Sequence, residues 1–279
     1  MEKPIERMLS DKSLDMPFCL CWANENWSRR WDGSETSILM AQDYGDKQGW
    51  QDHFEYLLNF FNDERYLKDE QGRPILLIYK PQLITTLDEM LSCWRDLAQK
   101  AGLPGICFVC QYPQYGSEIE DKFDHYVEFE PAATTGIPGS NFLKAWEISP
   151  KYAVEVGLTK ILQVTRIRSY KKYSYKDTVA ASIKRPIRNS KEWVGAFPGW
   201  DNTPRRGENA ILYDGSTPAL FEKYVEAQLK KSKAAGQEGV LFINAWNEWA
   251  EGAHLEPDEK YKMKYLEALK NAREKANNE

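Results

Sequence analysis

One segment of the chain, Phe242-Ile243-Asn244-Ala245-Trp246-Asn247-Glu248-Trp249-Ala250-Glu251-Gly252, joins an apolar run to a cluster of acids and indoles. Residues 240–243 are apolar and predict a buried strand. Two carboxylates three residues apart follow it, and carboxylates beside indoles suit sugar chemistry, in which acids move protons and flat rings stack on the sugar. The alternative is a cap cluster that opens a helix, with the tryptophans in the core.

Two other segments repeat this composition after an apolar run. They are Cys21-Trp22-Ala23-Asn24-Glu25-Asn26-Trp27-Ser28-Arg29-Arg30-Trp31-Asp32-Gly33 and Trp193-Val194-Gly195-Ala196-Phe197-Pro198-Gly199-Trp200-Asp201-Asn202-Thr203-Pro204-Arg205. Three unrelated helix caps would not be expected all to combine tryptophans with acids and amides directly after a predicted strand. The three segments together therefore predict one pocket.

Strand-like and helix-like patterns alternate along the chain, which predicts βαβ units and a parallel sheet. The strand-like runs are Phe18–Trp22, Ile75–Tyr79, Gly105–Gln111, His125–Phe129, Val194–Phe197 and Val240–Trp246. The helical patterns are Met1–Met8, Gly49–Phe61, Leu87–Ala101, Pro218–Ala235 and Tyr261–Lys275.

The candidate sites follow strands, as in a (β/α)8 barrel of the TIM type. A doubly wound sheet usually adds a glycine-rich phosphate loop, and no such loop occurs in this sequence. Only six strands are found, so we expect a single α/β domain over residues 1–279 that forms an incomplete barrel. Its open edge is expected beside the Phe18–Trp22 strand.

The composition is that of an ordinary soluble globular protein, with 42% hydrophobic and 28% charged residues in 279. No apolar run approaches the ~20 residues that span a bilayer, so a cytoplasmic protein without an integral membrane segment is expected. The five cysteines argue against a disulfide framework. Cys19, Cys21, Cys107 and Cys110 lie in apolar runs, where buried thiols are a better interpretation than a zinc site. We predict no metal and no cofactor.

Positive charge is concentrated in residues 141–191, which hold twelve Lys or Arg against three acids in a chain of net charge −5. This stretch has the least regular pattern and is expected to be an irregular crossover. A solvated face is its simplest interpretation. The alternative is contact with phosphate, from a nucleotide, a lipid diphosphate or a membrane surface. Nothing in the sequence indicates nucleic-acid binding, and the oligomeric state is left open.

Three motifs resemble the WbsX family of bacterial surface-polysaccharide glycosyltransferases. They are Trp22 to Gly33, Gly199-Trp200-Asp201-Asn202-Thr203-Pro204-Arg205 and Asn244 to Pro257, and the resemblance runs from Pro17 to Pro257. The family resembles glycoside hydrolase family 99, the endo-α-mannosidases, whose fold is a (β/α)8 barrel. Family members carry an earlier segment that would supply two further strands, so the resemblance implies an N-terminally truncated member, whose missing part could hold a targeting signal.

The resemblance implies a role for each acid of the last motif. Glu251 matches the acid/base that protonates the leaving oxygen. Glu248 matches the base that acts on the sugar's 2-hydroxyl, so that an anhydro-sugar forms with net retention. Ala250 stands where the mannosidases usually have His, and therefore the same specificity is not implied.

The remaining site residues are predicted from residue type and from position after a strand. We expect sugar-hydroxyl contacts and stacking surfaces from Trp22, Asn24, Glu25, Asn26, Trp27, Trp31, Asp32, Tyr79, Tyr112, Glu130, Trp200, Asp201, Asn202, Arg205, Trp246, Asn247 and Trp249.

Three functions remain open on the sequence. The first is glycosidase-like cleavage of an α-linked, mannose-type glycan. The second is transfer from a nucleotide- or lipid-linked sugar donor, although the Asp-x-Asp motif of many metal-dependent transferases is absent. The third is a non-catalytic carbohydrate-binding module, against which the presence of both Glu248 and Glu251 argues. The expected partner is a glycan or a sugar donor, with peripheral membrane contact through 141–191 as an alternative.

Overall fold

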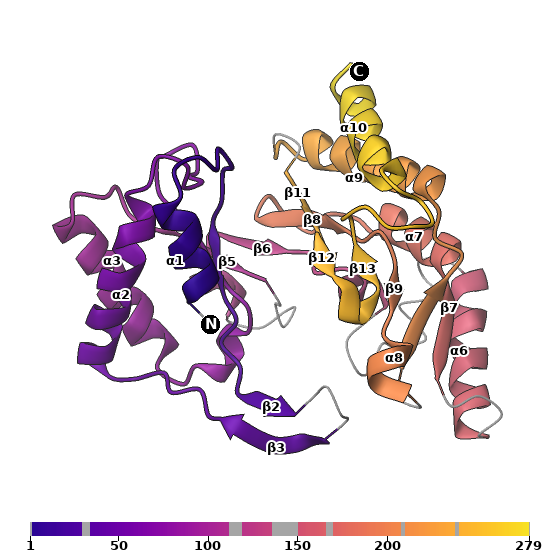
Figure 1. Ribbon diagram of the computed structural model, residues 1–279, viewed down its shortest axis with the longest axis horizontal. Coiled ribbons are helices and arrows are strands. Elements are labelled where there is room, and N and C mark those ends of the chain that lie inside the picture. The colour runs from indigo at the N-terminus through magenta and orange to yellow at the C-terminus, as the bar shows by residue number, and fades with distance from the viewer. Residues whose placement is uncertain are drawn as a thin grey trace. The chain divides into compact units, whose positions relative to one another are not determined.

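A computed structural model describes residues 2–29, 34–111, 119–135, 150–165, 170–207, 210–237 and 240–278. The chain divides into two compact units (Figure 1). Unit 1 comprises Met1–Trp27 and Ile38–Tyr126, and unit 2 comprises Ser28–Ser37 and Val127–Glu279.

Unit 1 is built on parallel strands and three helices. The strands are β1 (Leu20–Trp22), β4 (Ile75–Ile78), β5 (Cys107–Cys110) and β6 (His125–Val127), paired in that order. The helices are α1 (Lys3–Ser10), α2 (Lys47–Phe61) and α3 (Leu87–Lys100), with 3₁₀ turns at Pro81–Leu83 and Glu120–Lys122. The strands β2 (Trp27–Arg29) and β3 (Ser34–Met40) pair with each other, and most of both strands falls in Ser28–Ser37, which belongs to unit 2.

Aromatic side chains fill the core of unit 1. Trp94 of α3 is fully buried and stacks on Phe108 of β5, with ring centroids 6.2 Å apart. Phe60 and Phe61 of α2 are equally buried. Burial of such large rings contributes most of the apolar stabilisation available to a sheet of short strands.

Unit 2 contains two further strands of the main sheet, β8 (Glu192–Ala196) and β11 (Leu241–Ile243), which pair in parallel. A second sheet has the order β7 (Lys171–Ser174), β10 (Ile211–Asp214) and β9 (Trp200–Asp201). The helices are α4 (Ala132–Thr135), α6 (Pro150–Val164), α7 (Tyr175–Lys184), α8 (Thr203–Arg206), α9 (Pro218–Ala234) and α10 (Lys264–Asn277). A small hairpin, β12 (Asn247–Glu248) and β13 (Ala253–His254), encloses a 3₁₀ turn, η5 (Trp249–Glu251).

The strand order of the main sheet is β1-β4-β5-β6-β8-β11. All six predicted strands occur, most of them shorter than their apolar runs, and the sheet confirms an incomplete barrel of about six strands. Within the described ranges, β1 pairs with β4 alone and β11 pairs with β8 alone.

Glycine is required at one crossing inside unit 2. A Cβ added to Gly195 of β8 would lie 1.8 Å from the carbonyl oxygen of Glu128. This distance is far shorter than a van der Waals contact, so no residue with a side chain fits at this position. The amide group of Gln228 on α9 donates to the Gly195 carbonyl at 2.7 Å. This hydrogen bond joins β8 to α9.

The basic stretch 141–191 is more regular than its sequence pattern indicated. Its described part contains α6, β7 and α7. Ser174 caps α7 by accepting from the backbone N–H of Asp177 at 3.2 Å. Residues 141–149 and 166–169 lie outside the described residues.

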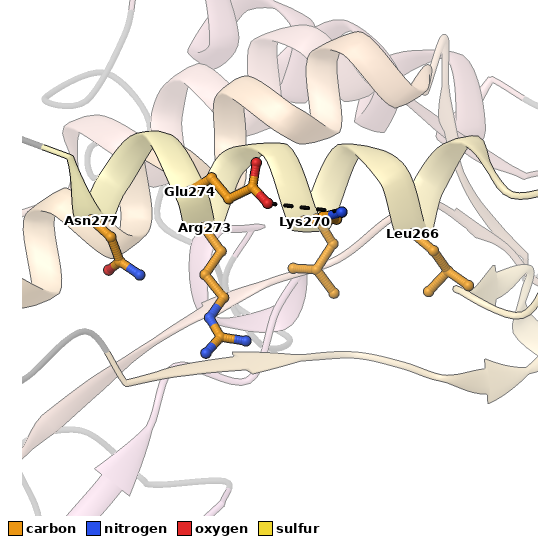
Figure 2. A pocket seen from close by; sticks show the side chains of 6 residues that line it. Leu266, Lys270, Arg273, Glu274 and Asn277 are labelled. Carbon is orange, nitrogen blue, oxygen red and sulfur yellow. Dashed lines mark ion pairs between the residues drawn. The ribbon is translucent and has the colours of Figure 1, made fainter.

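A groove of about 660 Å³ lies along α10 (Figure 2). It is lined by Leu266, Leu269, Lys270, Arg273, Glu274 and Asn277. A neighbouring hollow of about 390 Å³ adds Leu241 and Ile243 of β11. Neither hollow contains a predicted site residue, and only the second one includes residues of β11.

No helix within the described ranges combines the length and the apolar composition needed to cross a membrane.

Candidate active site

The chain leaves β11 through Asn244, which is held at both its backbone and its side chain. Its backbone N–H donates to Ala196 of β8 at 2.9 Å, and its amide group donates to the carbonyl oxygen of Glu130 at 2.8 Å. The peptide bond from Asn244 to Ala245 is cis. These contacts fix the start of the loop that carries both predicted catalytic acids.

Glu248 and Glu251 stand at the two ends of η5. The 3₁₀ turn has about three residues per turn, so side chains three positions apart lie one above the other. An extended chain would separate the two side chains instead. Glu248 is the last residue of β12 and directly precedes this turn, so the turn brings the two residues close together. That their carboxylates face one pocket stays a prediction.

Glu251 is half-buried and paired with Arg205 of α8 (Figure 1 shows α8, β12 and β13). One guanidinium nitrogen, Nη1, lies 3.1 Å from the Oε1 atom of Glu251. Burial raises the pKa of Glu251 above its ordinary value, Arg205 opposes that rise, and the negative charge of Glu248 adds to it. A carboxyl group with a raised pKa suits a general acid.

The short helix α8 is fixed so that Arg205 reaches the turn. The Oδ1 atom of Asp201 accepts from the backbone N–H of Thr203 at 2.9 Å and from its hydroxyl at 2.6 Å. Asn202 is 4% exposed, and its side-chain oxygen accepts from the backbone N–H of Ile211 at 2.7 Å. Both side chains were predicted to line one wall of the pocket, and here they hold the backbone that presents Arg205.

Gly252 brings η5 close to β9. Its backbone has φ +62°, in the left-handed region, and an added Cβ would lie 3.0 Å from the nitrogen of Asp201. Glycine meets both requirements, since it has no Cβ and adopts positive φ readily.

Exposed indoles surround the same loop. Trp246 and Trp249 are about half exposed, at 51% and 50%. Trp249 stacks on His254, with centroids 3.8 Å apart, and its ring N–H donates to Glu256 at 2.6 Å. Trp200 is half-buried, and its ring N–H has no hydrogen-bond partner among the described residues. Trp246 and Trp249 thus have ring surface available for stacking, and that they stack on sugar stays a prediction.

Glu130 lies inside unit 2, with 1% exposure. Its Oε1 atom accepts from Thr134 at 2.7 Å, Ser182 at 2.9 Å and Arg185 at 3.1 Å. Burial raises the pKa of Glu130, and Arg185 opposes that rise. The Glu130 carboxylate is occupied by these neighbouring groups. The contact of Glu130 with the site is instead made by its backbone carbonyl oxygen, which accepts from the Asn244 side chain.

The predicted site residues of unit 1 mostly bind one another. Asn24 is fully buried, with its amide group donating to the Lys80 carbonyl and its oxygen accepting from the Lys80 N–H, both at 2.8 Å. Glu25 pairs with the Lys80 ammonium at 2.6 Å. Asn26 accepts from the backbone N–H of Gln42 at 2.7 Å.

The aromatic residues predicted in unit 1 differ in exposure. Trp22 packs edge-on against His53, with centroids 4.9 Å apart, and contacts Trp94. Burial lowers the pKa of His53, which fits a neutral ring in this cluster. Trp27 is 50% exposed, and Tyr79 is half-buried beneath the Lys80 ammonium at 5.1 Å.

Trp31, Asp32 and Tyr112 lie outside the described residues. The other predicted site residues are divided between the two units, with Trp22 to Trp27 and Tyr79 in unit 1 and the acids of η5 in unit 2. That all three motifs line one pocket stays a prediction.

Three residues that matter to the site were missed from the sequence. Lys80 binds Asn24 and Glu25, Arg206 adds a second positive charge that lowers the pKa of Glu251, and Gly252 permits the approach to β9. A glycine directly after an acid is a usable signal, because it predicts a turn. Lys80 carried no local signal, since its partners lie 55 and 56 positions away.

No group of three or more His, Cys, Asp and Glu side chains within the described ranges could hold a metal ion. The five cysteines are free, and burial raises the pKa of Cys107 to about 12.

A parallel sheet of six strands, with acids and indoles after its last strand, defines an α/β protein with an incomplete TIM-type barrel. One solved structure, "Glycoside hydrolase-like protein", has a TM-score of 0.51 at 13% identity, covering 87% of this chain and 65% of that one. A second, the GH99 endo-alpha-mannosidase from Bacteroides thetaiotaomicron, has a TM-score of 0.47 at 16% identity, covering 85% and 67%.

The chain belongs to the WbsX family, described as "Glycosyltransferase WbsX", which it matches over residues 1–269. It is also 31% identical over 278 residues to "Uncharacterized protein WxcX" of Xanthomonas campestris pv. campestris (strain B100). That alignment covers 98% of this chain and 37% of the relative, so the chain spans little more than a third of the relative's length.

Proposed function

We propose that this chain carries the catalytic carboxylates of a carbohydrate-active enzyme that cleaves or transfers α-linked, mannose-type glycosyl units. Glu251 acts as acid/base, and Glu248 acts as base on the sugar's 2-hydroxyl. The observation that carries the proposal is the arrangement around η5: two acids three residues apart, one of them half-buried with a raised pKa and held by Arg205.

The chemistry follows from this arrangement. A protonated Glu251 donates its proton to the leaving oxygen, and the resulting carboxylate then takes a proton from the attacking water or sugar hydroxyl. Glu248 withdraws the 2-hydroxyl proton while the 2-oxygen bonds to the anomeric carbon and the bond from that carbon to the leaving oxygen breaks. When water or a sugar hydroxyl attacks the anomeric carbon, the bond to the 2-oxygen breaks and Glu248 returns the proton to that oxygen. The exposed faces of Trp246 and Trp249 supply stacking surface for the sugar. Bacterial surface polysaccharide is the proposed setting, in the cytoplasm.

The test is Glu251→Gln in the intact protein, with turnover of an α-mannosyl oligosaccharide as the measurement. The amide keeps the size of the side chain and removes the transferable proton, so turnover falls by about 10²–10⁴ while ligand affinity changes little. Glu256→Gln is the matched control, since Glu256 lies on the same loop and its side-chain carboxylate accepts from the Trp249 ring N–H, a contact that the amide oxygen of glutamine can keep. Near-wild-type turnover of Glu251→Gln would remove the acid/base role from this residue.

The family description favours a second candidate, transfer from a nucleotide- or lipid-linked sugar. The basic stretch offers less free charge for such a donor than its sequence indicates. Arg185 pairs with the buried Glu128 and Glu130 at 2.8 and 3.1 Å, and Lys172 pairs with Asp214 at 2.7 Å. Two other cations of this stretch are Lys171, the first residue of β7, and Lys184, the last residue of α7.

A ligand-induced shift in melting temperature separates the two candidates, because a ligand that binds only the folded state raises its apparent stability. Mannose-type oligosaccharide raises the melting temperature of the intact protein if the chemistry is glycosidase-like, and nucleoside diphosphates with Mg²⁺ do not. If the nucleotide acts instead, Lys171→Gln with Lys184→Gln abolishes its effect without breaking the Arg185 cluster. A nucleotide effect that survives both substitutions would exclude the basic stretch as the phosphate site.

A further inference from the structure

We propose that Arg205 is a positioning residue for Glu251: its guanidinium fixes the direction of the Glu251 carboxylate and opposes its protonation, so that Arg205 sets the pH range in which the site works. This inference rests on the acid/base role proposed for Glu251. In this proposal, Arg205 acts on Glu251, whereas the sequence predicted that Arg205 contacts the substrate.

The contact has a geometry that the surrounding chain enforces. Arg205 and Glu251 are 46 positions apart, and their side chains are 28% and 21% exposed, so the ion pair is largely shielded from water. Asp201 and Asn202 hold the start of α8, and Gly252 lets η5 approach β9 with no side chain between them. An arginine on a free loop would lose much of this contact to side-chain entropy.

The charges around Glu251 act in opposite directions. Burial is the largest influence and favours the protonated acid, and Glu248 of β12 does the same. Arg205 is the strongest influence favouring the carboxylate, and Arg206 of the same helix is weaker. Other charged groups beside this loop have partners elsewhere: His254 of β13 pairs with Asp258 at 3.3 Å, Glu256 accepts from the Trp249 ring N–H at 2.6 Å, and Asp201 of β9 accepts from Thr203.

A consequence for pH dependence follows from these signs. A general acid must be protonated, so turnover falls as the pH rises through the pKa of Glu251. Removal of the positive charge of Arg205 raises that pKa, because the remaining influences, burial and Glu248, favour the protonated form. The alkaline limb of the pH profile therefore moves to higher pH in Arg205→Gln.

The first measurement follows Glu251 directly, without substrate. Carbon-13 NMR of glutamate side-chain carboxyl groups, with the Glu251 signal assigned by its loss in Glu251→Gln, gives its titration in wild type, Arg205→Gln and Arg205→Lys. We expect a higher pKa in Arg205→Gln and recovery toward the wild-type titration in Arg205→Lys, which restores the charge. Arg206→Gln is the matched control and shifts the titration less. An unmoved titration in Arg205→Gln, or a larger shift in Arg206→Gln, would overturn the inference.

The second measurement is the pH profile of turnover in the same variants of the intact protein. We expect the alkaline limb of kcat to follow the titration, with KM nearly unchanged. A raised KM with an unmoved limb would make Arg205 a substrate contact and would overturn the inference.

The two proposals fail in different ways. If Glu251→Gln keeps its turnover while the titration still responds to Arg205, the proposed function is wrong. If Glu251→Gln loses turnover but the pKa of Glu251 does not change in Arg205→Gln, only the positioning role of Arg205 is wrong.

Discussion

Two strand ends with nearly the same composition are used differently by the two units. After β1, Asn24 and Glu25 bind Lys80 at the end of the neighbouring strand, so the polar side chains join two strand ends. After β11, Glu248 directly precedes a 3₁₀ turn that ends at Glu251, and the Glu251 carboxylate pairs with Arg205 of the short helix α8. The first arrangement neutralises its charges locally, while the second keeps a carboxyl group half-buried with a raised pKa.

The difference shows that composition at a strand end does not decide between support and chemistry. The role of a polar side chain depends on whether its hydrogen-bonding groups bind the protein or remain accessible to a ligand. Asn24 uses both ends of its amide on backbone groups and is fully buried, so it has no accessible group for a ligand. Trp246 and Trp249 keep half of their surfaces exposed.

The largest expected effect on stability comes from Asn24→Ala in unit 1. The substitution leaves the Lys80 carbonyl and N–H without their partner, at about 1–3 kcal/mol for each group. We expect the free energy of unfolding to fall by about 2–4 kcal/mol in urea-induced unfolding. Asn26→Ala is the matched control, because Asn26 is exposed and accepts one hydrogen bond, and it should cost less than about 1 kcal/mol. Equal losses in the two variants would contradict the supporting role of Asn24.

The fold could be predicted from sequence because its signals are local. The six apolar runs correspond to β1, β4, β5, β6, β8 and β11. Two of the predicted helices end one residue before their predicted ends at Ala101 and Ala235, since α3 ends at Lys100 and α9 ends at Ala234. The second sheet was missed, because β7, β9 and β10 are short and their sequences do not alternate clearly between apolar and polar residues. Their pairing, such as Tyr213 with Tyr173, depends on contacts between distant segments.

The candidate site was predictable only in part, for a related reason. The spacing of Glu248 and Glu251 is local, and the condition that the chain turn helically between them is met by η5. The partners are distant: Arg205 reaches Glu251 across 46 positions, and Arg185 reaches Glu130 across 55. Residue type alone therefore suggested sugar contacts for Glu130, Asn24 and Arg205, whose side chains bind protein groups here.

A smaller effect is expected from Gly252→Ala in unit 2. Alanine at φ +62° costs about 1–3 kcal/mol, and its Cβ would meet the backbone nitrogen of Asp201 at 3.0 Å. The free energy of unfolding should fall within that range, and turnover should fall with it, because η5 moves away from α8. Gly236→Ala is the matched control, since Gly236 has φ +73° with nothing within 4 Å of an added Cβ. If the two variants lose the same stability and Gly252→Ala keeps full turnover, the approach of η5 to β9 does not serve the site.

The smallest effect is expected from Glu25→Gln, and it tests the comparison most directly because the same change at Glu251 should be so costly to turnover. The Glu25–Lys80 pair, with side chains 19% and 21% exposed, is shielded from water about as far as the Arg205–Glu251 pair. Its loss should still cost only about 1 kcal/mol, because the cost of ordering two side chains offsets most of the attraction in a partly exposed ion pair. Thermal unfolding at low and at high salt should show a small loss that shrinks as salt screens the wild-type pair. The fall in kcat should be far smaller than in Glu251→Gln, and any contact of Glu25 with sugar would raise KM instead. If Glu25→Gln lowered kcat as much as Glu251→Gln without changing stability, the polar cluster after β1 would carry chemistry too, and the contrast between the two strand ends would be lost.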